Sequence, residues 1–161
     1  MARNKTLVII PALNEAKNLV KLLPQISREY DVLVIDDGST DDTSGVAKKF
    51  TKHVIRNEKN RGVGASLRTG FEYAIRKGYE NCIVVNADLQ HPASLIHEFI
   101  KDLRNADAVI GSRFVGDTRK MPFVRKLGNN FFTSLVNLFY GTSYTDVTCG
   151  MRAFRTRVLP K

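Results

Sequence analysis

The sequence predicts an α/β fold in which a mostly parallel sheet is flanked by helices, and two observations support this prediction. Short apolar runs alternate with amphipathic segments along most of the chain, which is the pattern of consecutive βα units. The apolar runs are rich in Val and Ile and lie at 7–10, 32–35, 53–56, 82–85 and 108–110. Residues 145–154 are expected to add a turn and a further strand. At 161 residues the chain is expected to form one domain.

Amphipathic segments predict a helix after each of the first four strands. The helix at 15–23 places its leucines on one face and has Pro24 near its end. The acidic stretch 36–43, DDGSTDDT, is expected to turn at Gly38 and then to cap a helix that ends at Phe50. The loop 57–64 leads into a helix that ends near Lys77, and the helix 92–104 follows the fourth strand.

A longer helix is predicted at 123–140, after the fifth strand. Its apolar residues recur at spacings of three and four, at Val124, Leu127, Phe131, Leu135 and Leu138. Such a stripe usually packs on its own domain, and this is the interpretation we favour. A basic amphipathic helix that bears aromatic residues can instead lie on a membrane surface.

The net charge of +9 is distributed unevenly along the chain. Residues 1–112 hold 16 Lys and Arg against 14 Asp and Glu, whereas residues 113–161 hold 9 against 2. This excess predicts an anionic partner for the C-terminal third, either phosphate, lipid head groups or nucleic acid, with a solvated basic face as the alternative. The two cysteines lack a metal-ligand spacing, which fits a reducing cytosol.

Three acidic residues follow the ends of strands one, two and four, namely Glu15, Asp37 and Asp88. In a parallel sheet these strand ends share one edge, where ligands bind, so the three are expected to converge. A carboxylate beside strand two can accept a hydrogen bond from a ribose hydroxyl or a base N–H. Asp88, with Asn86 and Gln90 beside it, offers oxygen ligands suited to Mg²⁺ or Mn²⁺.

The familiar motifs of several other site types are absent from the sequence. It contains no GxGxxG, no P-loop, no HExxH and no GxSxG. The acidic stretch 36–43 lacks the Glu and the flanking helices of an EF-hand. Gly62-Val63-Gly64 predicts only a turn that enters a helix, and His91 is interpreted as a turn residue.

Six motifs together resemble family 2 glycosyltransferases, and they occur in the order seen in that family. They are IPALNE (10–15), VIDDGSTDDT (34–43), NRGVGASLRTG (60–70), NADLQHP (86–92), GSRF (111–114) and TDVTCGMRAF (145–154). The chain is most similar to the dolichyl- or polyprenyl-phosphate sugar synthases within the family, and the resemblance covers essentially its whole length. It implies a GT-A fold, a nucleotide-sugar donor, a divalent cation (Mg²⁺ or Mn²⁺) and inversion at the anomeric carbon.

The resemblance also assigns roles to residues at matching positions. It implies a nucleotide-sugar pocket lined by Pro11, Leu13, Glu15, Ile35, Asp37, Asn86, Ala87, Asp88 and Arg113. Asp88 and Arg113 would be the catalytic residues, and Asp88, Gln90 and Asn86 would hold the metal. The acceptor phosphate would meet Arg113 and Arg125.

The sequence departs from the family pattern at two of these positions. Leu13 stands where relatives often have an aromatic residue, so base stacking is expected to be weaker. Asn86 stands where the family usually has Asp, and an amide oxygen ligates without carrying charge, so ion affinity is expected to fall or to shift in preference. A degenerate, non-catalytic domain that binds membranes or anions is therefore an alternative.

The predicted function is transfer of a hexose to a polyprenyl or dolichyl phosphate, with GDP-mannose favoured as donor and UDP-glucose second. Residues 1–112 would bind the nucleotide and residues 113–161 the acceptor, in a domain that continues beyond Lys161 in relatives. The basic third would contact the cytoplasmic face of a membrane peripherally, and no nucleic-acid partner is expected. The alternative acceptor is a glycan hydroxyl, for which Asp146 is the candidate general base.

Overall fold

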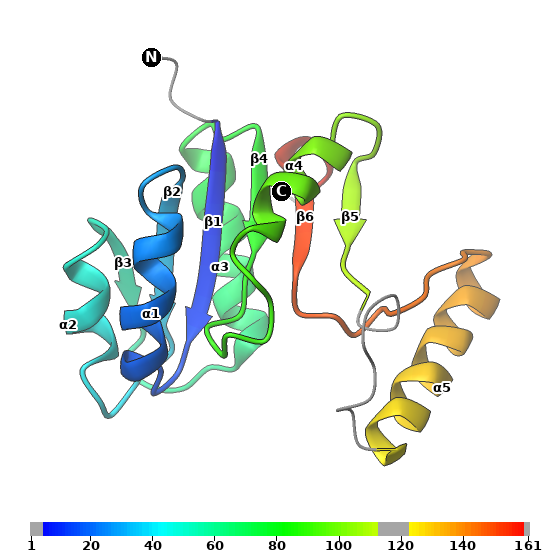
Figure 1. Ribbon diagram of the computed structural model, residues 1–161, viewed down its shortest axis with the longest axis horizontal. Helices are drawn as coiled ribbons and strands as arrows, with labels where there is room; N and C mark the ends of the chain where they lie inside the picture. The colour runs from blue at the N-terminus through cyan, green and yellow to red at the C-terminus, as the bar shows by residue number, and fades with distance from the viewer. Residues whose placement is uncertain (1–4, 113–122, 160–161) are drawn as a thin grey trace.

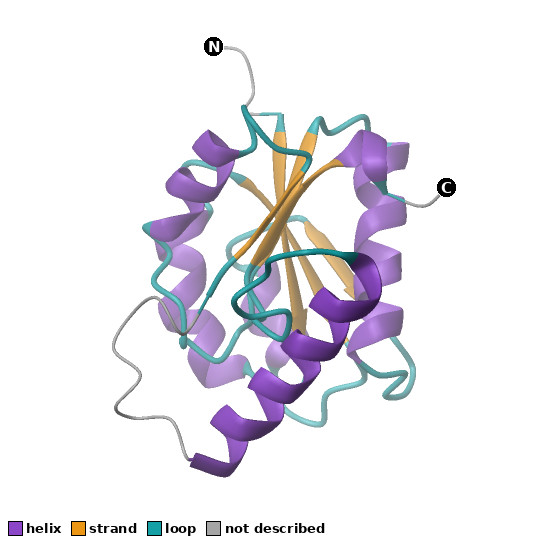
Figure 2. Ribbon diagram, turned by 90° about the vertical axis from the view of Figure 1, so that its right-hand side faces the viewer, coloured by secondary structure: helices purple, strands orange, loops and turns teal. Residues whose placement is uncertain are grey.

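The computed structural model describes residues 5–112 and 123–159, which form a six-stranded sheet with helices on both faces (Figures 1 and 2). The predicted α/β fold is therefore confirmed. The strands are β1 (Thr6–Ala12), β2 (Asp31–Asp36), β3 (His53–Arg56), β4 (Asn81–Val84), β5 (Ala108–Ile110) and β6 (Arg152–Arg155).

The strand order in the sheet is β3-β2-β1-β4-β6-β5. The strand β1 pairs in parallel with β2 on one side and with β4 on the other, as the pattern of βα units predicts. The strand β6 inserts antiparallel between β4 and β5, with Val84 opposite Arg152. The residues that precede β6 are therefore brought beside the carboxyl end of β4.

Within the described residues, five α-helices accompany the sheet: α1 (Ala16–Ile26), α2 (Thr43–Lys48), α3 (Val63–Arg76), α4 (Leu95–Asp102) and α5 (Phe123–Tyr140). Two predicted helix boundaries were wrong by three residues each. The helix α1 continues past Pro24, because Ile26 is fully buried in the core and holds the last turn in place. The helix α4 begins three residues later than predicted, because two successive turns occupy the segment that starts at Pro92.

Alternate side chains of β1 face opposite layers of helices. Val8 and Ile10 pack in the larger core with α1, α2 and α4, whereas Leu7 and Ile9 pack in the smaller core with α3. All four side chains are fully buried. Burial on both faces is typical of a central strand in a parallel sheet, and it fixes the position of the loop that follows β1.

The helix α3 approaches β1 and β2 most closely at Gly70. A Cβ at this position would lie 2.6 Å from Ile9 Cγ2 and 3.2 Å from Ile35 Cδ1. We expect Gly70→Ala to lower the free energy of unfolding by about 1–3 kcal/mol through overpacking, as measured by urea denaturation. Gly64→Ala in the first turn of α3 is the control, because its Cβ would meet no atom within 4 Å. Equal stability of the two variants would contradict the close contact.

The helix α5 has the predicted bounds, but its orientation differs from the favoured interpretation. Its apolar residues Phe131, Phe132, Leu138 and Phe139 are 59–77% exposed. Its polar side faces the rest of the domain: Thr133 is buried, and the Asn137 amide bonds the backbone of Tyr144. The predicted packing of the apolar stripe on the domain was therefore wrong for Phe131 and Leu138. Polar contacts with the following loop hold the helix instead.

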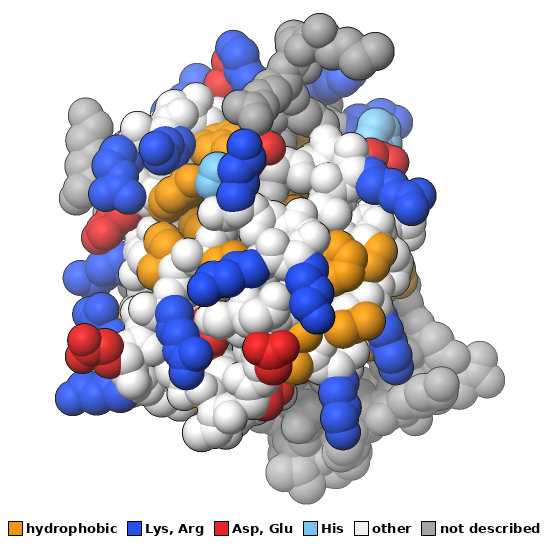
Figure 3. All heavy atoms as spheres, turned by 90° about the vertical axis from the view of Figure 1, so that its left-hand side faces the viewer, with side chains coloured by type: hydrophobic (Ala, Val, Ile, Leu, Met, Phe, Trp, Pro, Cys, Tyr) orange, Lys and Arg blue, Asp and Glu red, His pale blue; other side chains and the backbone are white. Residues whose placement is uncertain are grey.

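Basic side chains are also present far from the C-terminal third. On the face built by α2 and β3, Lys and Arg side chains are scattered among neutral and acidic ones (Figure 3). Lys48, Lys49 and Lys52 lie here, around a shallow hollow at the end of α2. Among the described residues of this face, the positive charges are therefore dispersed rather than aligned in one strip.

Candidate functional site

A cavity of about 340 Å³ lies at the carboxyl ends of β1, β2 and β4. The structure brings together here the three acidic residues singled out in the sequence, Glu15, Asp37 and Asp88. The other lining residues are Pro11, Ala12, Leu13, Asn60, Gly62, Val63, Ser66, Asn86 and Ala87. The cavity lies where an open α/β sheet binds ligands, and its volume falls within the range of small-molecule sites.

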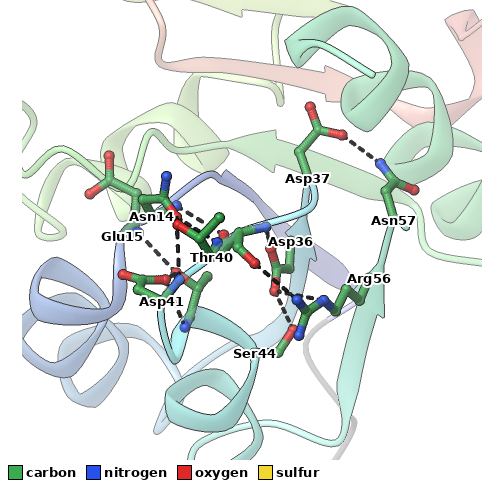
Figure 4. Close-up of polar contacts among 11 residues, drawn as sticks. Asn14, Glu15, Asp36, Asp37, Thr40, Asp41, Ser44, Arg56 and Asn57 are labelled. Atoms are coloured by element: carbon green, nitrogen blue, oxygen red, sulfur yellow. Dashed lines mark hydrogen bonds and ion pairs between the residues drawn. The ribbon is translucent and has the colours of Figure 1, made fainter. Parts of the chain in front are cut away.

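The loop after β1 is tied to the acidic loop after β2 (Figure 4). Asn14 has a φ of 58°, and its side-chain oxygen accepts hydrogen bonds from the N–H and hydroxyl of Thr40, at 2.8 and 3.1 Å. The next two backbone N–H groups donate to Thr43 Oγ1 and Asp41 Oδ2. Much of the acidic stretch 36–43 thus serves to position the loop that carries Glu15.

Asp36 is completely buried at the end of β2 and belongs to this framework. Its carboxylate accepts hydrogen bonds from the Ser39 N–H at 2.8 Å and from the Ser44 hydroxyl. Arg56 lies 3.8 Å from it and also bonds the Ser39 carbonyl (Figure 4). Burial alone would raise the pKa of Asp36, but these hydrogen bonds and the Arg56 charge lower it on balance.

Asp37 points away from Asp36 and holds the loop 57–62 that follows β3 (Figure 4). Its carboxylate accepts hydrogen bonds from Asn57 Nδ2 at 2.7 Å and from the N–H groups of Arg61 and Gly62 at 3.0 and 2.8 Å. Burial would raise the pKa of Asp37, but these three donors lower it. Three of its roughly four lone-pair positions are used, which leaves one of them for a ligand.

Acid should destabilise the fold, because the pKa of Asp36, Asp37 and Asp41 is lowered in the folded state. A carboxyl with a lowered native pKa contributes stability that is fully present above its unfolded-state pKa of about 3.9 and is lost as the pH falls through the native value. We therefore expect the free energy of unfolding to be level above about pH 5 and to fall steadily below about pH 4. Urea denaturation between pH 3 and pH 7 measures this, and Asp41→Asn should flatten the slope.

The turn after β4 presents its polar groups at the mouth of the cavity. Asp88 is exposed, and its Oδ1 accepts the Gln90 N–H at 3.1 Å. Leu89 has a φ of 60°, a left-handed conformation that is uncommon for a branched side chain. The Asp88 carboxylate is thus held in place by the turn and retains most of its acceptor positions. Gln90 is exposed and does not line the cavity.

The loop before β6 packs directly against this turn. A Cβ at Gly150 would lie 2.1 Å from Asn86 Nδ2, so glycine is required for the Asn86 side chain to rest there. His91 Nε2 lies 3.6 Å from the buried Cys149 Sγ. Asp146 is buried, and its Oδ1 accepts hydrogen bonds from the N–H and hydroxyl of Thr148. Because β6 inserts beside β4, the loop 146–150 packs against the turn 86–90 after β4. We call this turn the candidate metal turn.

Four residues assigned to the site lie outside the cavity or cannot be placed, and Gln90 is one of them. Ile35 is fully buried in the core under α3 and is not among the residues that line the cavity, whereas it was predicted to contact the nucleoside. A strand side chain that points into the core supports the site through packing and cannot reach a ligand. Arg113 lies outside the described residues, and Arg125 lies in the part of α5 whose side chains are outside the description.

One wall of the cavity was missed by the sequence analysis. Asn60, Gly62, Val63 and Ser66 line it from the start of α3. The sequence offered two signals here: the glycine pair at 62 and 64, which predicted a turn, and the motif NRGVGASLRTG (60–70), to which no role in the site was assigned. Gly62 does adopt a φ of 87°, a conformation that favours glycine, but its proximity to Asp37 depends on the pairing of β2 with β3.

The sequence profile of glycosyl transferase family 2 matches residues 7–161. The chain belongs to this family. The polyprenol monophosphomannose synthase of Mycolicibacterium smegmatis is 31% identical, across 98% of this chain and 64% of its own length. The undecaprenyl-phosphate mannosyltransferase of Micrococcus luteus is 32% identical, across 96% of this chain and 68% of its own length. The chain thus spans about two thirds of these relatives.

The fold of this family 2 member is also that of solved glycosyltransferases. Glucosyl-3-phosphoglycerate synthase from Mycobacterium tuberculosis, in complex with Mn²⁺, UDP-glucose and glycerol 3-phosphate, superposes with a TM-score of 0.75. It is 22% identical and is matched over 98% of this chain and 58% of its own. This likeness confirms the expected GT-A fold.

The family implies a divalent ion, and the side chains of this family 2 chain determine how such an ion could be held. Within residues 5–112 and 123–159, no three His, Cys, Asp or Glu side chains gather to hold a metal. The oxygen donors that the turn after β4 brings to the cavity are the Asp88 carboxylate and the Asn86 amide. Mg²⁺ usually binds one or two carboxylates together with substrate phosphates. This donor set therefore fits an ion that arrives with a diphosphate better than a permanently bound one.

Proposed function

We propose that the chain is an inverting glycosyltransferase that moves a hexose from a nucleotide sugar to a polyprenyl or dolichyl phosphate. GDP-mannose is the favoured donor and UDP-glucose the second. The main support is the single cavity at three strand ends, which joins Glu15 and Asp37 on one side to Asn86 and Asp88 on the other. Membership of family 2 and the activities of the two mannosyl-transferring relatives support the same reaction class.

The reaction requires alignment and charge stabilisation more than proton transfer. A polyprenyl phosphate is already anionic near neutral pH, so no protein base has to activate it. One of its oxygens forms a bond to the anomeric carbon while the bond to the nucleoside diphosphate breaks, and the configuration inverts. Asp88 and Arg113 are proposed to position the diphosphate, and a divalent ion held by Asp88 and Asn86 would neutralise charge on it.

The acceptor is proposed to reach the site from the side of α5. The exposed Phe131, Phe132, Leu138 and Phe139 form an apolar outer face, and the sequence places Arg125 and Lys126 on the same helix. Aromatic and basic residues together suit the interface of an anionic membrane. None of the helices in the described part of the chain is long and apolar enough to span a bilayer. Peripheral contact with the cytoplasmic face is thus our proposal, with Arg113 and Arg125 meeting the acceptor phosphate.

The proposal is tested by thermal unfolding with GDP-mannose, UDP-glucose or UDP-GlcNAc, each with and without Mn²⁺. Binding to the native state raises the melting temperature by mass action. A donor that shifts it is then used for transfer to a polyprenyl phosphate and, in parallel, to a glycan hydroxyl. No shift with any donor would favour a degenerate domain, and transfer only to the glycan would favour the alternative acceptor with Asp146 as base.

Asn86→Asp tests the unusual residue of the candidate metal turn. The two side chains have nearly the same shape, so the contact with Gly150 should be retained while a second negative charge is added beside Asp88. We expect the variant to bind the donor more tightly in Mn²⁺ than the parent does, by about three- to tenfold, and equally without the ion. Calorimetric titration measures both. Identical Mn²⁺ dependence in parent and variant would remove the proposed role of Asn86.

A further inference from the structure

We propose that a second cavity, at the end of the sheet opposite the candidate functional site, binds a phosphate monoester. This cavity has a volume of about 400 Å³, and its lining includes Arg104, Arg155 and Arg157 together with Glu80 and Asn81. The strand β4 begins beside it and β6 ends beside it, so it lies at the end of the sheet away from α5 (Figure 1). The inference does not depend on the proposed function.

Arg155 is held in place because it bonds the end of α4. Its Nε donates to the Leu103 carbonyl at 2.9 Å, and its Nη2 donates to the Arg104 carbonyl at 3.0 Å. A cation in this position satisfies the last carbonyls of a helix and interacts favourably with the helix dipole. The Arg155 side chain is 32% exposed, and its Nη1 bonds no atom within the described residues. A guanidinium has five N–H donors, so Arg155 is fixed by the fold and still keeps donors for a ligand.

The charges around this cavity do not balance. Asp107 Oδ1 accepts a hydrogen bond from Arg157 Nη2 at 2.6 Å and lies 3.8 Å from Arg155 Nε. Glu80, a carboxylate in the lining, is paired with Lys5. The three arginines and this lysine thus share two carboxylates, which leaves an excess of two positive charges.

Arg104 is the arginine of this group that no carboxylate neutralises. Its side chain is exposed and has no hydrogen bond or ion pair within the described part of the chain. Its backbone carbonyl bonds Arg155, which keeps the two residues side by side. Like charges at short range repel one another. An anion that lies among the three guanidinium groups would remove this repulsion.

The excess charge and the apolar part of the lining indicate the class of ligand. A phosphate monoester carries nearly two negative charges near neutral pH and offers three acceptor oxygens. Guanidinium groups match phosphate oxygens in paired hydrogen bonds. Ile100 and Leu103 line the same cavity and offer an apolar surface to the organic group of the ester. The volume of the cavity lies within the range of small-molecule sites.

The experiment is a titration of the ¹⁵N-labelled protein with phenyl phosphate near neutral pH, followed by ¹H–¹⁵N NMR. We expect saturating shifts of the Glu80, Arg104 and Thr156 amides, which belong to residues of this cavity. Benzoate, an aromatic anion with one charge, should bind about tenfold more weakly. Arg104→Gln should weaken phenyl phosphate binding about tenfold, the factor for one charge-assisted hydrogen bond. Its melting temperature should equal that of the parent, because the Arg104 side chain has no partner in the described fold.

Two further variants separate a site from a general effect of surface charge. Lys101→Gln is the matched control, because Lys101 is exposed on the same helix and does not line the cavity. It removes the same charge but should change the affinity by less than about twofold, since exposed charges are screened by salt. Asp107→Asn should act in the opposite direction and tighten binding about threefold. It releases Arg157 Nε and Nη2 from their carboxylate, so that both can bond the ligand.

Each other result overturns the assignment. Such results are the absence of shifts at the three amides, equal affinity for benzoate and phenyl phosphate, equal losses in Arg104→Gln and Lys101→Gln, and unchanged or weaker binding in Asp107→Asn. A lower melting temperature of Arg104→Gln would show that its side chain serves the fold. Shifts confined to Leu13 and Asp88 would place the phosphate in the candidate functional site instead. Nucleotide binding is measured separately, so a failure here leaves the proposed function standing.

Discussion

Asp88→Asn should lower kcat for hexose transfer by about 10²- to 10³-fold, the typical cost of removing one electrostatic contact to a transition state. The reason is the loss of the one carboxylate that the turn after β4 presents at the cavity. The turn itself should survive, because an asparagine oxygen can still accept the Gln90 N–H that Asp88 Oδ1 accepts at 3.1 Å. The melting temperature should therefore change little while activity collapses.

Transfer of labelled hexose to polyprenyl phosphate in detergent measures this effect, with donor binding determined in the same samples. Asp102→Asn at the end of α4 is the matched control, because Asp102 is an exposed carboxyl that does not line the cavity. It should keep the activity of the parent. If Asp88→Asn retains more than about a tenth of the parent kcat, Asp88 has no catalytic role, whatever its effect on donor binding.

The strands and their common edge could be predicted because they depend on local pattern. Val32–Ile35 and Cys82–Val85 are apolar runs of strand length, and parallel pairing then brings Asp37 and Asp88 to one edge without further information. The position of β6 could not be predicted in this way. Its antiparallel insertion between β4 and β5 depends on pairing with strands about 70 and 45 residues away, as Arg155 with Asn81 and Arg152 with Ile110 show, and no short motif specifies such a register.

The roles of individual residues in the site were harder to predict than its location. Asp36 and Asp37 are adjacent and identical, yet one is buried under α2 and the other faces α3, because successive residues of a strand point to opposite faces. That alternation was available in the sequence and could have separated the two roles. The place of Ser66 in the cavity lining was not available, since it depends on how closely α3 packs at Gly70.

Asp37→Ala should destabilise the protein and also weaken donor binding, because one carboxylate holds an entire wall of the cavity. The substitution leaves the Arg61 N–H and the Asn57 amide without their acceptor, and the Gly62 N–H with only Asn60 Oδ1 at 2.8 Å. At about 1–3 kcal/mol for each partly buried group left unpaired, we expect a loss of about 2–4 kcal/mol in the free energy of unfolding. The loop 57–62 should also become more exposed to amide hydrogen exchange.

Asp42→Ala is the control for charge and location, because Asp42 lies in the same acidic loop, is exposed and makes no capping hydrogen bond. It should leave nucleotide affinity unchanged, whereas Asp37→Ala should lower it at least tenfold, since Gly62, Val63 and Ser66 lose their fixed position. Equal stability in the two variants would show that the loop is held by other contacts. If Asp37→Ala loses stability but keeps its nucleotide affinity, the ligand lies away from this wall. Asp37 would then have a structural role and no role in binding.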